Sequence, residues 1–354
     1  MDIRIQKNET PKAKPDQSKL GFGQYFTDHM FICPYSEEKG WHDPVIVPYA
    51  PFSLDPASMV FHYAQECFEG MKAYRTPDGS IQLFRPDKNA ERMALTHERL
   101  CMPKFPEDDF VEAVRALVEV EKDWVPSAPD TSLYLRPCTI GIEPRLGIKA
   151  SDSYLFFIIC SPSGAYYAEG VNPVPIYVED EFTRAAPGGT GAIKCGGNYA
   201  ASLLAQEKAH KMGYSQVLWL DGAERKYVEE VGSMNCFFKI DGVIYTAPAG
   251  GTVLRGITRM SCIELLKDWG YTVKEESISI DNLMAAAEEG RLEEVFGTGT
   301  AAVISPVGEL RYKDKVIKIN NGVTGEVTTR LYDTLTGIQW GRLPDEKGWT
   351  LKVN

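Results

Sequence analysis

The chain has 354 residues, of which 44% are hydrophobic and 25% are charged, and its formal net charge is −11. This length exceeds that of an average domain and predicts two domains, while the composition is ordinary for a water-soluble globular protein. The negative charge argues against nucleic acid or an anionic membrane as a partner, so an anionic substrate would need a local group of arginines.

Eight cysteines are scattered along the chain without a CxxC pair, and the five histidines show no ligand spacing. This pattern argues against a zinc site, an iron–sulfur cluster and a disulfide framework, and it predicts no bound metal. The N-terminus has neither a hydrophobic signal core nor an arginine-rich transit peptide, and no apolar run approaches the ~20 residues of a membrane-spanning helix. We therefore expect a cytoplasmic protein with reduced thiols.

The first half of the chain combines predicted strands with predicted helices. Runs of β-branched and aromatic residues predict strands over 79–86, 131–141 and 153–162. Helices are expected over 87–100 and 107–125, and in the second of these the apolar residues recur at helical spacing after an acidic first turn. This half is predicted to form an α+β domain.

The residue composition changes between about 165 and 190, where glycines and prolines surround one short strand-like run, "VPIYVE". Such a stretch is typical of a domain boundary. We therefore expect a small N-terminal domain over 1–168, an interdomain linker over 169–182 and a larger cofactor-binding domain over 183–354.

The second half contains more and shorter elements. Asn198 is expected to cap a helix that ends at Gly213. Two pairs of strand-like runs surround the Asp-Gly dipeptides at 221–222 and 241–242, which is the strongest short-range signal for a hairpin. Hairpins mixed with helices argue against a regular βαβ repeat, and the further helices are expected over 258–269, 281–290 and 324–340.

One lysine, Lys194, stands among residues with little or no side chain in "TGAIKCGGNYAAS" (190–202). The commoner interpretation of such a residue is a lysine in a flexible loop. The alternative is an amine beside a bulky planar group, where desolvation lowers the lysine pKa from ~10.4 and favours attack on a carbonyl. A Schiff-base lysine that holds pyridoxal phosphate uses this chemistry.

A pyridoxal phosphate site also needs a phosphate cradle. The best candidate is "GGTVLRGITRMSC" (250–262), where Gly256 permits close approach and Thr258 opens a predicted helix, although a simple capped helix start has the same pattern. A second small, hydroxyl-rich turn occurs at 295–303 with Thr298 and Thr300. Neither segment matches GxGxxG or a P-loop, so a dinucleotide or a triphosphate lacks support.

The cofactor's ring nitrogen requires a carboxylate. Glu229 and Glu230 are adjacent on a predicted strand, and only one of them can face inward because neighbouring strand residues point to opposite faces. The residues alone do not choose between the two, and either could be an exposed edge charge.

These stretches together resemble the branched-chain amino acid aminotransferases, within the fold-type IV class of pyridoxal-phosphate enzymes, and in length the longer branch that includes the mammalian enzymes. The resemblance covers nearly the whole chain and is carried by "FEGMKAYR" (68–75), "LFRPDKNAERM" (83–93), "SLYLRPCTIGIEPRLG" (132–147), "KCGGNYAASLLAQ" (194–206), "EVGSMNCFF" (230–238), "LRGITR" (254–259) and "VFGTGTAAVISPV" (295–307). It implies a two-domain mixed α/β fold, with a small α+β domain and a larger domain whose mixed sheet forms a pseudo-barrel.

The implied activity is a reversible, ping-pong transfer of an amino group between L-leucine, L-isoleucine or L-valine and 2-oxoglutarate in a homodimer. The resemblance assigns the internal aldimine and the proton shuttle to Lys194, the contact with the cofactor's phenolic oxygen to Tyr199, and the pyridinium partner to Glu230. It assigns the phosphate to Arg92, and it implies that the small residues around Lys194 clear room for the cofactor. The remaining implied cofactor contacts are Ser233, Leu254, Gly256, Ile257, Thr258 and Thr300.

The implied substrate pocket is apolar and aromatic. Phe68, Tyr166, Tyr63 and Tyr134 are expected to line it, the last two from the partner subunit. The backbone of Thr300 and Ala301 is expected to hold the α-carboxylate, and Arg136 the distal carboxylate of glutamate or 2-oxoglutarate.

Two departures from the family pattern occur. The redox-active CxxC of the mammalian relatives is replaced here by Ala302 and Ser305, so no thiol switch is expected, and Ser233 stands where the family has threonine. The rival interpretations are a D-amino acid aminotransferase or an aminodeoxychorismate lyase, which are usually shorter, and a non-catalytic pyridoxal-phosphate-binding protein. The intact set of Lys194, Tyr199 and Glu230 argues against the last of these.

Overall fold

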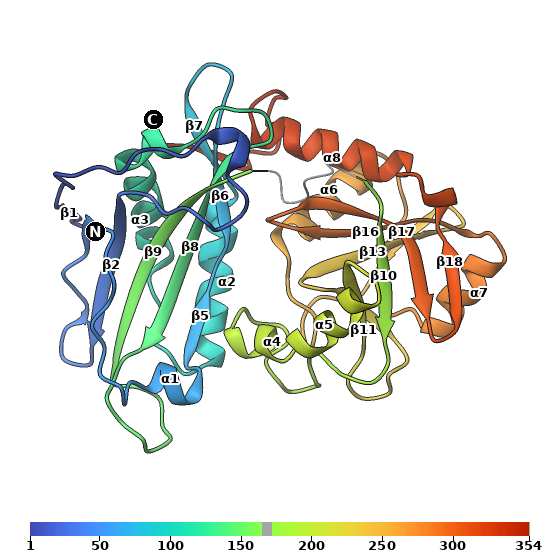
Figure 1. The fold of residues 1–354 in the computed structure, drawn as a ribbon, viewed down its shortest axis with the longest axis horizontal. Helices are drawn as coiled ribbons and strands as arrows, with labels where there is room; N and C mark the ends of the chain where they lie inside the picture. Colours follow the sequence, from blue (N-terminus) through green and yellow to red (C-terminus); the bar gives the residue numbers. More distant parts are fainter. Residues whose placement is uncertain (165–171, 354) are drawn as a thin grey trace. The chain divides into compact units, whose positions relative to one another are not determined.

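The computed structural model describes residues 1–164 and 172–353 (Figure 1). The chain divides into two compact units. The first unit comprises the described residues of 1–166, 194–196 and 337–354, and the second unit those of 167–193 and 197–336.

The first unit is built on a ten-stranded sheet in the order β1-β4-β2-β9-β8-β6-β7-β19, with β3 paired to β2 and β5 to β8. Its strands are β1 (Arg4–Ile5), β2 (His29–Ser36), β3 (Gly40–Trp41), β4 (Val45–Pro48), β5 (Glu66–Phe68), β6 (Met71–Arg75), β7 (Ile81–Phe84), β8 (Ser132–Gly141), β9 (Ser153–Ser163) and β19 (Thr350–Lys352). Its helices are α1 (Met59–Tyr63), α2 (Pro86–Arg99) and α3 (Glu107–Val120), with short 3-10 turns η1 (Gln17–Lys19) and η2 (Lys122–Trp124).

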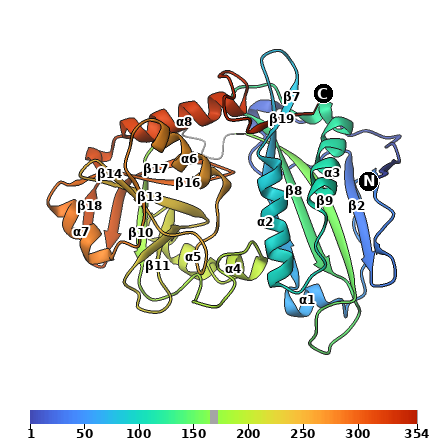
Figure 2. The ribbon, with the colours of Figure 1, turned by 180° about the vertical axis from the view of Figure 1, so that it is seen from behind.

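Two helices cover one face of this sheet. In Figure 2, α2 and α3 lie in front of β8, β9 and β2. Phe110 and Leu117 of α3 pack in one buried cluster with Phe31 of β2 and with Phe156 and Ile158 of β9. Because side chains alternate along a strand, the residues between these buried positions point to the other face of the sheet.

The second unit contains β10 (Val174–Glu179), β11 (Gln216–Leu220), β12 (Val228–Val231), β13 (Met234–Ile240), β14 (Val243–Thr246), β15 (Val273–Glu275), β16 (Leu292–Gly299), β17 (Val303–Tyr312) and β18 (Lys315–Lys318). The helices after residue 172 are α4 (Gly196–Ala200), α5 (Leu203–Lys211), α6 (Ile257–Asp268), α7 (Ile280–Glu288) and α8 (Glu326–Gln339), with the 3-10 turn η3 (Asn320–Gly322). None of the described helices has both the length and the apolar character that crossing a bilayer requires.

Six strands of the second unit close into a barrel. The order β12-β11-β10-β17-β16-β13 is completed by a further pairing of β12 with β13. The strand β10 runs parallel to both of its neighbours, whereas the other pairs in the ring are antiparallel. This closed mixed sheet confirms the predicted fold class.

The hairpins predicted from Asp-Gly dipeptides are present. Asp241 and Gly242 connect β13 to β14, with φ values of 49° and 75°. Two consecutive positive φ angles are the requirement of a type I′ turn, whose twist matches that of the strands it joins. The Asp221-Gly222 pair also lies between antiparallel strands, β11 and β12, but there the connection is longer, over 221–227, and neither residue has a positive φ.

Three expectations differ from the structure. Asn198 does not cap one long helix: it lies inside α4, and α5 begins separately after Ser202. Its side chain instead donates to the backbone carbonyls of Thr190 and Ile193. The segment expected to be a linker, 169–182, contains β10, which is one of the six strands of the barrel. The C-terminal residues from 337, expected in the larger domain, group with the first unit because β19 pairs with β7.

A buried histidine makes the stability of the first unit sensitive to acid. His97 of α2 contacts the Thr139 hydroxyl through Nε2 at 2.9 Å and accepts the Phe105 N–H at Nδ1, and burial lowers its pKa to about 4. In the unfolded chain the histidine pKa is ~6.5, so the unfolded state binds a proton at this residue more readily than the folded state does. The neutral, buried His97 therefore contributes fully to the free energy of unfolding above pH ~6.5. This contribution, up to about 3 kcal/mol, is lost as the pH falls towards 4.

We therefore expect H97Q to have a free energy of unfolding that falls less steeply between pH 6.5 and 4 than that of the wild type. Urea titrations at a series of pH values measure both slopes. Identical slopes in the two proteins would show that His97 is not the titrating group.

Candidate active site

The backbone of Lys194 is tied to two elements of the first unit. Its N–H donates to the Thr96 hydroxyl of α2 at 3.3 Å, and its carbonyl accepts the Phe68 N–H of β5 at 3.1 Å. The Lys194 Nζ lies over the Phe68 ring, 5.0 Å from its centroid. Lys194 is therefore held by contacts that are distant in sequence, and its amine lies on an aromatic ring. These contacts argue against the interpretation of Lys194 as a lysine in a flexible loop.

The glycines near Lys194 are required by protein atoms. The Gly196 N–H donates to the Glu66 carboxylate, and a Cβ at Gly196 would collide with that carboxylate. A Cβ at Gly191 would collide with Thr252 and Ala185 in the second unit, whereas one at Gly197 would meet nothing within 4 Å. Of these glycines, only Gly197 has open space beside it, so close approach of Glu66 and Thr252 explains the others.

Two aromatic side chains and two basic ones form a cluster on one face of the first unit's sheet. The Arg136 guanidinium lies 4.6 Å from the Phe68 ring centroid and 5.4 Å from that of Tyr134, and its Nη2 donates to the Tyr134 hydroxyl at 3.0 Å. Since Lys194 packs on the same Phe68 ring, one aromatic side chain links the lysine to the arginine. The predicted residues Phe68, Tyr134, Arg136 and Lys194 therefore form one cluster.

Two further aromatic residues, Tyr63 and Tyr166, were expected to line the substrate pocket. Tyr63 lies at the end of α1, is 38% exposed, and donates its hydroxyl hydrogen to the Leu146 carbonyl. Tyr166 lies outside the described residues. Tyr134, which was expected to act from the partner subunit, already contacts Arg136 of its own chain.

Arg92 of α2 is held by a buried carboxylate. Its Nε and Nη2 donate to the two oxygens of Glu69 at 2.8 and 2.7 Å, and Asn89 donates to the same carboxylate at 2.7 Å. Both members of this ion pair are buried in the first unit. The bidentate contact fixes the plane of the guanidinium, and Glu69 is thus a partner of Arg92 that the sequence did not indicate.

The structure separates the two adjacent acids of β12. Glu229 accepts a hydrogen bond from the Thr252 hydroxyl, and desolvation by burial raises its pKa. Glu230 accepts the Asn235 amide and the Leu254 N–H at Oε1, both at 2.9 Å, while its Oε2 lies 2.9 Å from Arg184 Nη2. Three donors therefore hold the Glu230 carboxylate in one orientation.

Glu230 also lines a pocket in the second unit. This pocket brings together four of the predicted cofactor residues, Tyr199, Glu230, Ser233 and Leu254, and its other lining residues are Arg184, Ile193, Asn198, Ser202 and Gly232. Arg184 was missed by the sequence analysis because it lies in a glycine- and proline-rich stretch without a motif. No local signal could have identified it.

A row of polar side chains crosses three strands beside this pocket. Glu230 of β12 stands opposite Asn235 of β13, which stands opposite Thr298 of β16. Asn235 also donates to the Leu254 carbonyl, and its side chain would collide with a Cβ at Gly256. Gly256, which directly precedes α6, must therefore be a glycine because the Asn235 side chain occupies the space of a Cβ.

The remaining predicted phosphate residues occupy two places in the second unit. Ile257 and Thr258 are the first residues of α6, where backbone N–H groups favour an anion, and both are buried. Thr300 and Ala301 form the turn between β16 and β17. Beside this turn, the Thr298 hydroxyl is buried and has no hydrogen-bond partner among the described residues.

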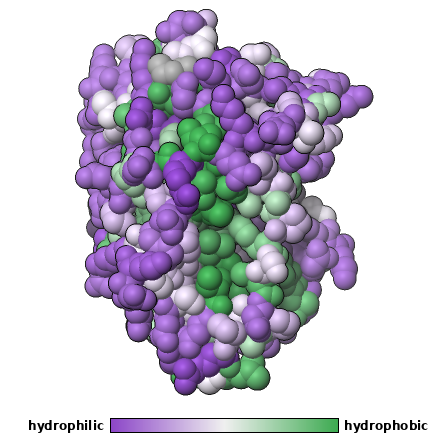
Figure 3. All heavy atoms as spheres, turned by 90° about the vertical axis from the view of Figure 1, so that its left-hand side faces the viewer, coloured by the Kyte–Doolittle hydropathy of each residue, from purple (hydrophilic) through white to green (hydrophobic). Residues whose placement is uncertain are grey.

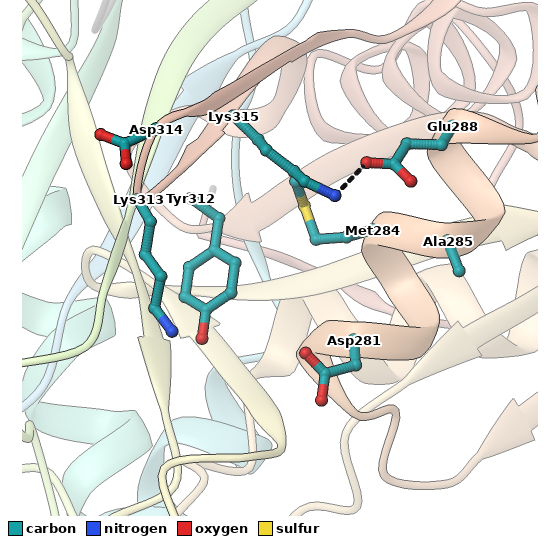
Figure 4. Close-up of a pocket in the computed structure, with 8 residues that line it drawn as sticks. All are labelled: Asp281, Met284, Ala285, Glu288, Tyr312, Lys313, Asp314 and Lys315. Carbon is teal, nitrogen blue, oxygen red and sulfur yellow. Dashed lines mark hydrogen bonds and ion pairs between the residues drawn. The ribbon is translucent and has the colours of Figure 1, made fainter.

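A separate pocket of about 540 Å³ lies between α7 and the β17–β18 hairpin (Figure 4). Its lining residues are Asp281, Met284, Ala285, Glu288, Tyr312, Lys313, Asp314 and Lys315, none of which was predicted as a site residue. The Lys315 amine is paired with Glu288 across the opening. This ion pair links α7 to β18 beside the pocket.

The chain has relatives along its whole length. It is 56% identical over 351 residues to branched-chain-amino-acid aminotransferase 2 of Bacillus subtilis, covering 99% of this chain and 97% of the relative. It is 48% identical over 363 residues to the branched-chain-amino-acid aminotransferase of Mycolicibacterium smegmatis, covering 100% and 99%.

Solved structures show the same fold. The branched-chain amino acid aminotransferase of Escherichia coli superposes with a TM-score of 0.77 at 29% identity, covering 92% of this chain and 99% of that one. The T.th. branched-chain amino acid aminotransferase complexed with N-(5'-phosphopyridoxyl)-L-glutamate gives a TM-score of 0.74 at 28% identity, covering 92% and 98%.

The model of the amino-transferase class IV family matches residues 66–310, which include Lys194, Glu230 and the start of α6. The matched segment is more than half of the chain, and the resemblance inferred from the seven sequence segments is confirmed. The chain belongs to the class IV aminotransferase family.

Proposed function

We propose that this chain is a branched-chain amino acid aminotransferase that uses pyridoxal phosphate to exchange an amino group between L-leucine, L-isoleucine or L-valine and 2-oxoglutarate. One observation supports this most directly: the Lys194 amine and the Arg136 guanidinium pack on the same Phe68 ring. An amine for the α-carbon, an apolar surface for a branched side chain and a cation for a second carboxylate are the groups that these two substrates require.

The residues of the second unit fit pyridoxal phosphate. A buried carboxylate, Glu230, is available for the ring nitrogen, and the first turn of α6 with Thr258 is available for the phosphate. The buried Thr298 hydroxyl, which has no partner within the described part of the chain, provides one more donor next to Thr300. The bound cofactor supplies an electron sink that allows the α-carbon of an amino acid to lose its proton.

The catalytic role proposed for Lys194 is proton transfer. Its Nζ would take the proton from the substrate's α-carbon and pass it to the cofactor's C4′, and it would carry a proton in the opposite direction when the keto acid is aminated. The two backbone hydrogen bonds to Thr96 and Phe68 hold the base of this side chain, so that the flexible part is limited to its methylene groups. The Tyr199 hydroxyl and the Glu230 carboxylate bind the cofactor, and the planar guanidinium of Arg92, oriented by Glu69, binds its phosphate.

Arg136 is proposed to distinguish the two kinds of substrate. A guanidinium binds a carboxylate in bidentate fashion, and Tyr134 holds this one by a hydrogen bond and an aromatic face. Glutamate and 2-oxoglutarate use this cation, whereas a branched aliphatic side chain packs against Phe68. The backbone of Thr300 and Ala301 holds the α-carboxylate that both substrates share.

We further propose that the enzyme is a homodimer. Opposite α2 and α3, the sheet of the first unit presents Ile32, Pro34, Leu155, Phe157 and Ile159, all half-buried, and Figure 3 shows hydrophobic side chains gathered in a band on this side of the molecule. A group of partly exposed apolar side chains on one face is typical of an interaction site. All eight cysteines, which lie within the described residues, are free thiols, and this supports a reducing, cytoplasmic location.

Light scattering on the purified protein tests the dimer. We expect twice the chain mass for the wild type, and the chain mass for F157D at the same concentration. The control V316D places the same charge on an exposed residue of β18 and should remain dimeric. A monomeric wild type would contradict the dimer.

A substrate panel tests the activity. The purified, yellow protein is mixed separately with L-leucine, L-isoleucine, L-valine, D-alanine and aminodeoxychorismate, first alone to follow the colour and then with 2-oxoglutarate as acceptor to follow glutamate. We expect bleaching and glutamate formation with the three branched L-amino acids. Turnover only with D-alanine or aminodeoxychorismate would assign a different reaction of the same fold, and a colour that no amino acid bleaches would identify a binding protein.

A further inference from the structure

Arg184 is a buried arginine whose contacts converge on the proposed cofactor site. Its Nη2 lies 2.9 Å from Glu230 Oε2, and the two side chains are only 8% and 4% exposed. The same nitrogen donates to the carbonyls of Gly191 and Thr252. Its Nε is buried without a hydrogen-bond partner among the described residues, so the guanidinium is incompletely satisfied where it stands.

The placement of this charge has an electrostatic consequence. A carboxylate as buried as Glu230 would favour its neutral form, and a guanidinium in contact with it favours the ionised form. The Asn235 amide and the Leu254 N–H add two donors that also favour the ionised carboxylate. Of these three groups only Arg184 carries a charge, so its removal should change the charge state of Glu230 most.

We propose that Arg184 is a positioning residue that keeps Glu230 ionised and turned towards the ring nitrogen of the cofactor, and that it couples this acid to the segment before Lys194. This inference rests on the proposed function. The coupling follows from its hydrogen bond to Gly191, which precedes Lys194 by three residues, while Asn198 holds the Thr190 and Ile193 carbonyls of the same segment. Arg184 acts through Glu230 and is assigned no contact with the substrate.

Replacing Arg184 with methionine keeps the length of the side chain and removes its charge. For R184M we expect the affinity of the apoenzyme for pyridoxal phosphate, measured by absorbance titration, to fall about 10- to 100-fold, by analogy with the loss of a residue that orients a metal ligand. The kcat with L-leucine should fall by a similar factor, and the pH dependence of the cofactor's visible absorbance should shift. R184K, which restores the charge, should recover most of the affinity.

A double-mutant cycle separates this role from a purely structural one. If Arg184 acts through Glu230, R184M should lower the cofactor affinity of an E230Q enzyme by less than about threefold, because the interaction is already lost. A loss equal to that in the wild type, or an R184M enzyme with unchanged cofactor affinity and unchanged absorbance titration, would overturn the proposal. E293Q is the control, since Glu293 pairs with Lys239 at 2.7 Å and does not line this pocket, and it should retain wild-type affinity.

These outcomes are distinct from failure of the proposed function. If the wild type binds the cofactor but transfers no amino group from leucine, the function is wrong, yet the affinity cycle between Arg184 and Glu230 still gives an answer. If the wild type is active and the cycle is additive, the function stands and the role of Arg184 falls.

Discussion

Replacing Lys194 with alanine should abolish amino transfer from L-leucine to 2-oxoglutarate, and the visible absorbance of the lysine-bound cofactor should disappear with it. We expect a loss of at least about 10⁴-fold in kcat, because removing the amine eliminates both the covalent attachment and the base at the α-carbon. The alanine variant keeps its backbone hydrogen bonds to Thr96 and Phe68, so its unfolding midpoint should stay close to that of the wild type.

The control for this experiment is K208A. Lys208 lies on α5, is paired with Glu181 at 2.9 Å and has a half-exposed side chain, so its loss removes the same methylene groups and charge from a surface position. K208A should turn over leucine at the wild-type rate. Transfer by K194A at more than about a hundredth of that rate would contradict the role assigned to Lys194.

Replacing Arg136 with methionine should change the substrate preference. The kcat/KM for L-glutamate should fall about 10- to 100-fold, since a charge-assisted hydrogen bond to a buried carboxylate contributes about 1.5–3 kcal/mol. The kcat/KM for L-leucine should change by less than about threefold, because an aliphatic side chain gains nothing from the guanidinium and methionine preserves the contact with Phe68.

Tyr134 provides an intermediate variant. Y134F keeps the ring beside Arg136 and removes the hydroxyl that accepts its Nη2 hydrogen bond, so glutamate should lose less than in the arginine variant and leucine almost nothing. Both half-reactions are measured separately by single-turnover absorbance changes. An equal loss for glutamate and leucine in R136M would remove the proposed role of Arg136.

Much of the local structure followed from local rules. The predicted helices over 87–100 and 258–269 correspond to α2 (Pro86–Arg99) and α6 (Ile257–Asp268), since apolar periodicity and end signals depend on neighbours within a few residues. The Asp241-Gly242 hairpin follows equally from two residues that accept positive φ angles. Asn198 shows where this reasoning fails: its amide can bond to any nearby carbonyl, and tertiary packing supplied Thr190 and Ile193.

The long-range partners of the site could not be predicted from the sequence. Gly196 is required because Glu66 approaches it from 130 positions away. Arg184 reaches Glu230 from a loop without any motif. Contacts of this kind depend on how the strands are ordered in the sheet, and no periodicity along the chain records that order.

The sequence by itself identified the family and singled out Lys194, Glu229 and Glu230 as candidates, because these inferences depend on residue identity and spacing alone. The tertiary structure decided what surrounds each acid. It turns Glu230 towards Arg184, Asn235 and Leu254, and Glu229 towards Thr252. The alternation of a strand sends neighbouring side chains to opposite faces, but only the strand's partners determine what each face meets.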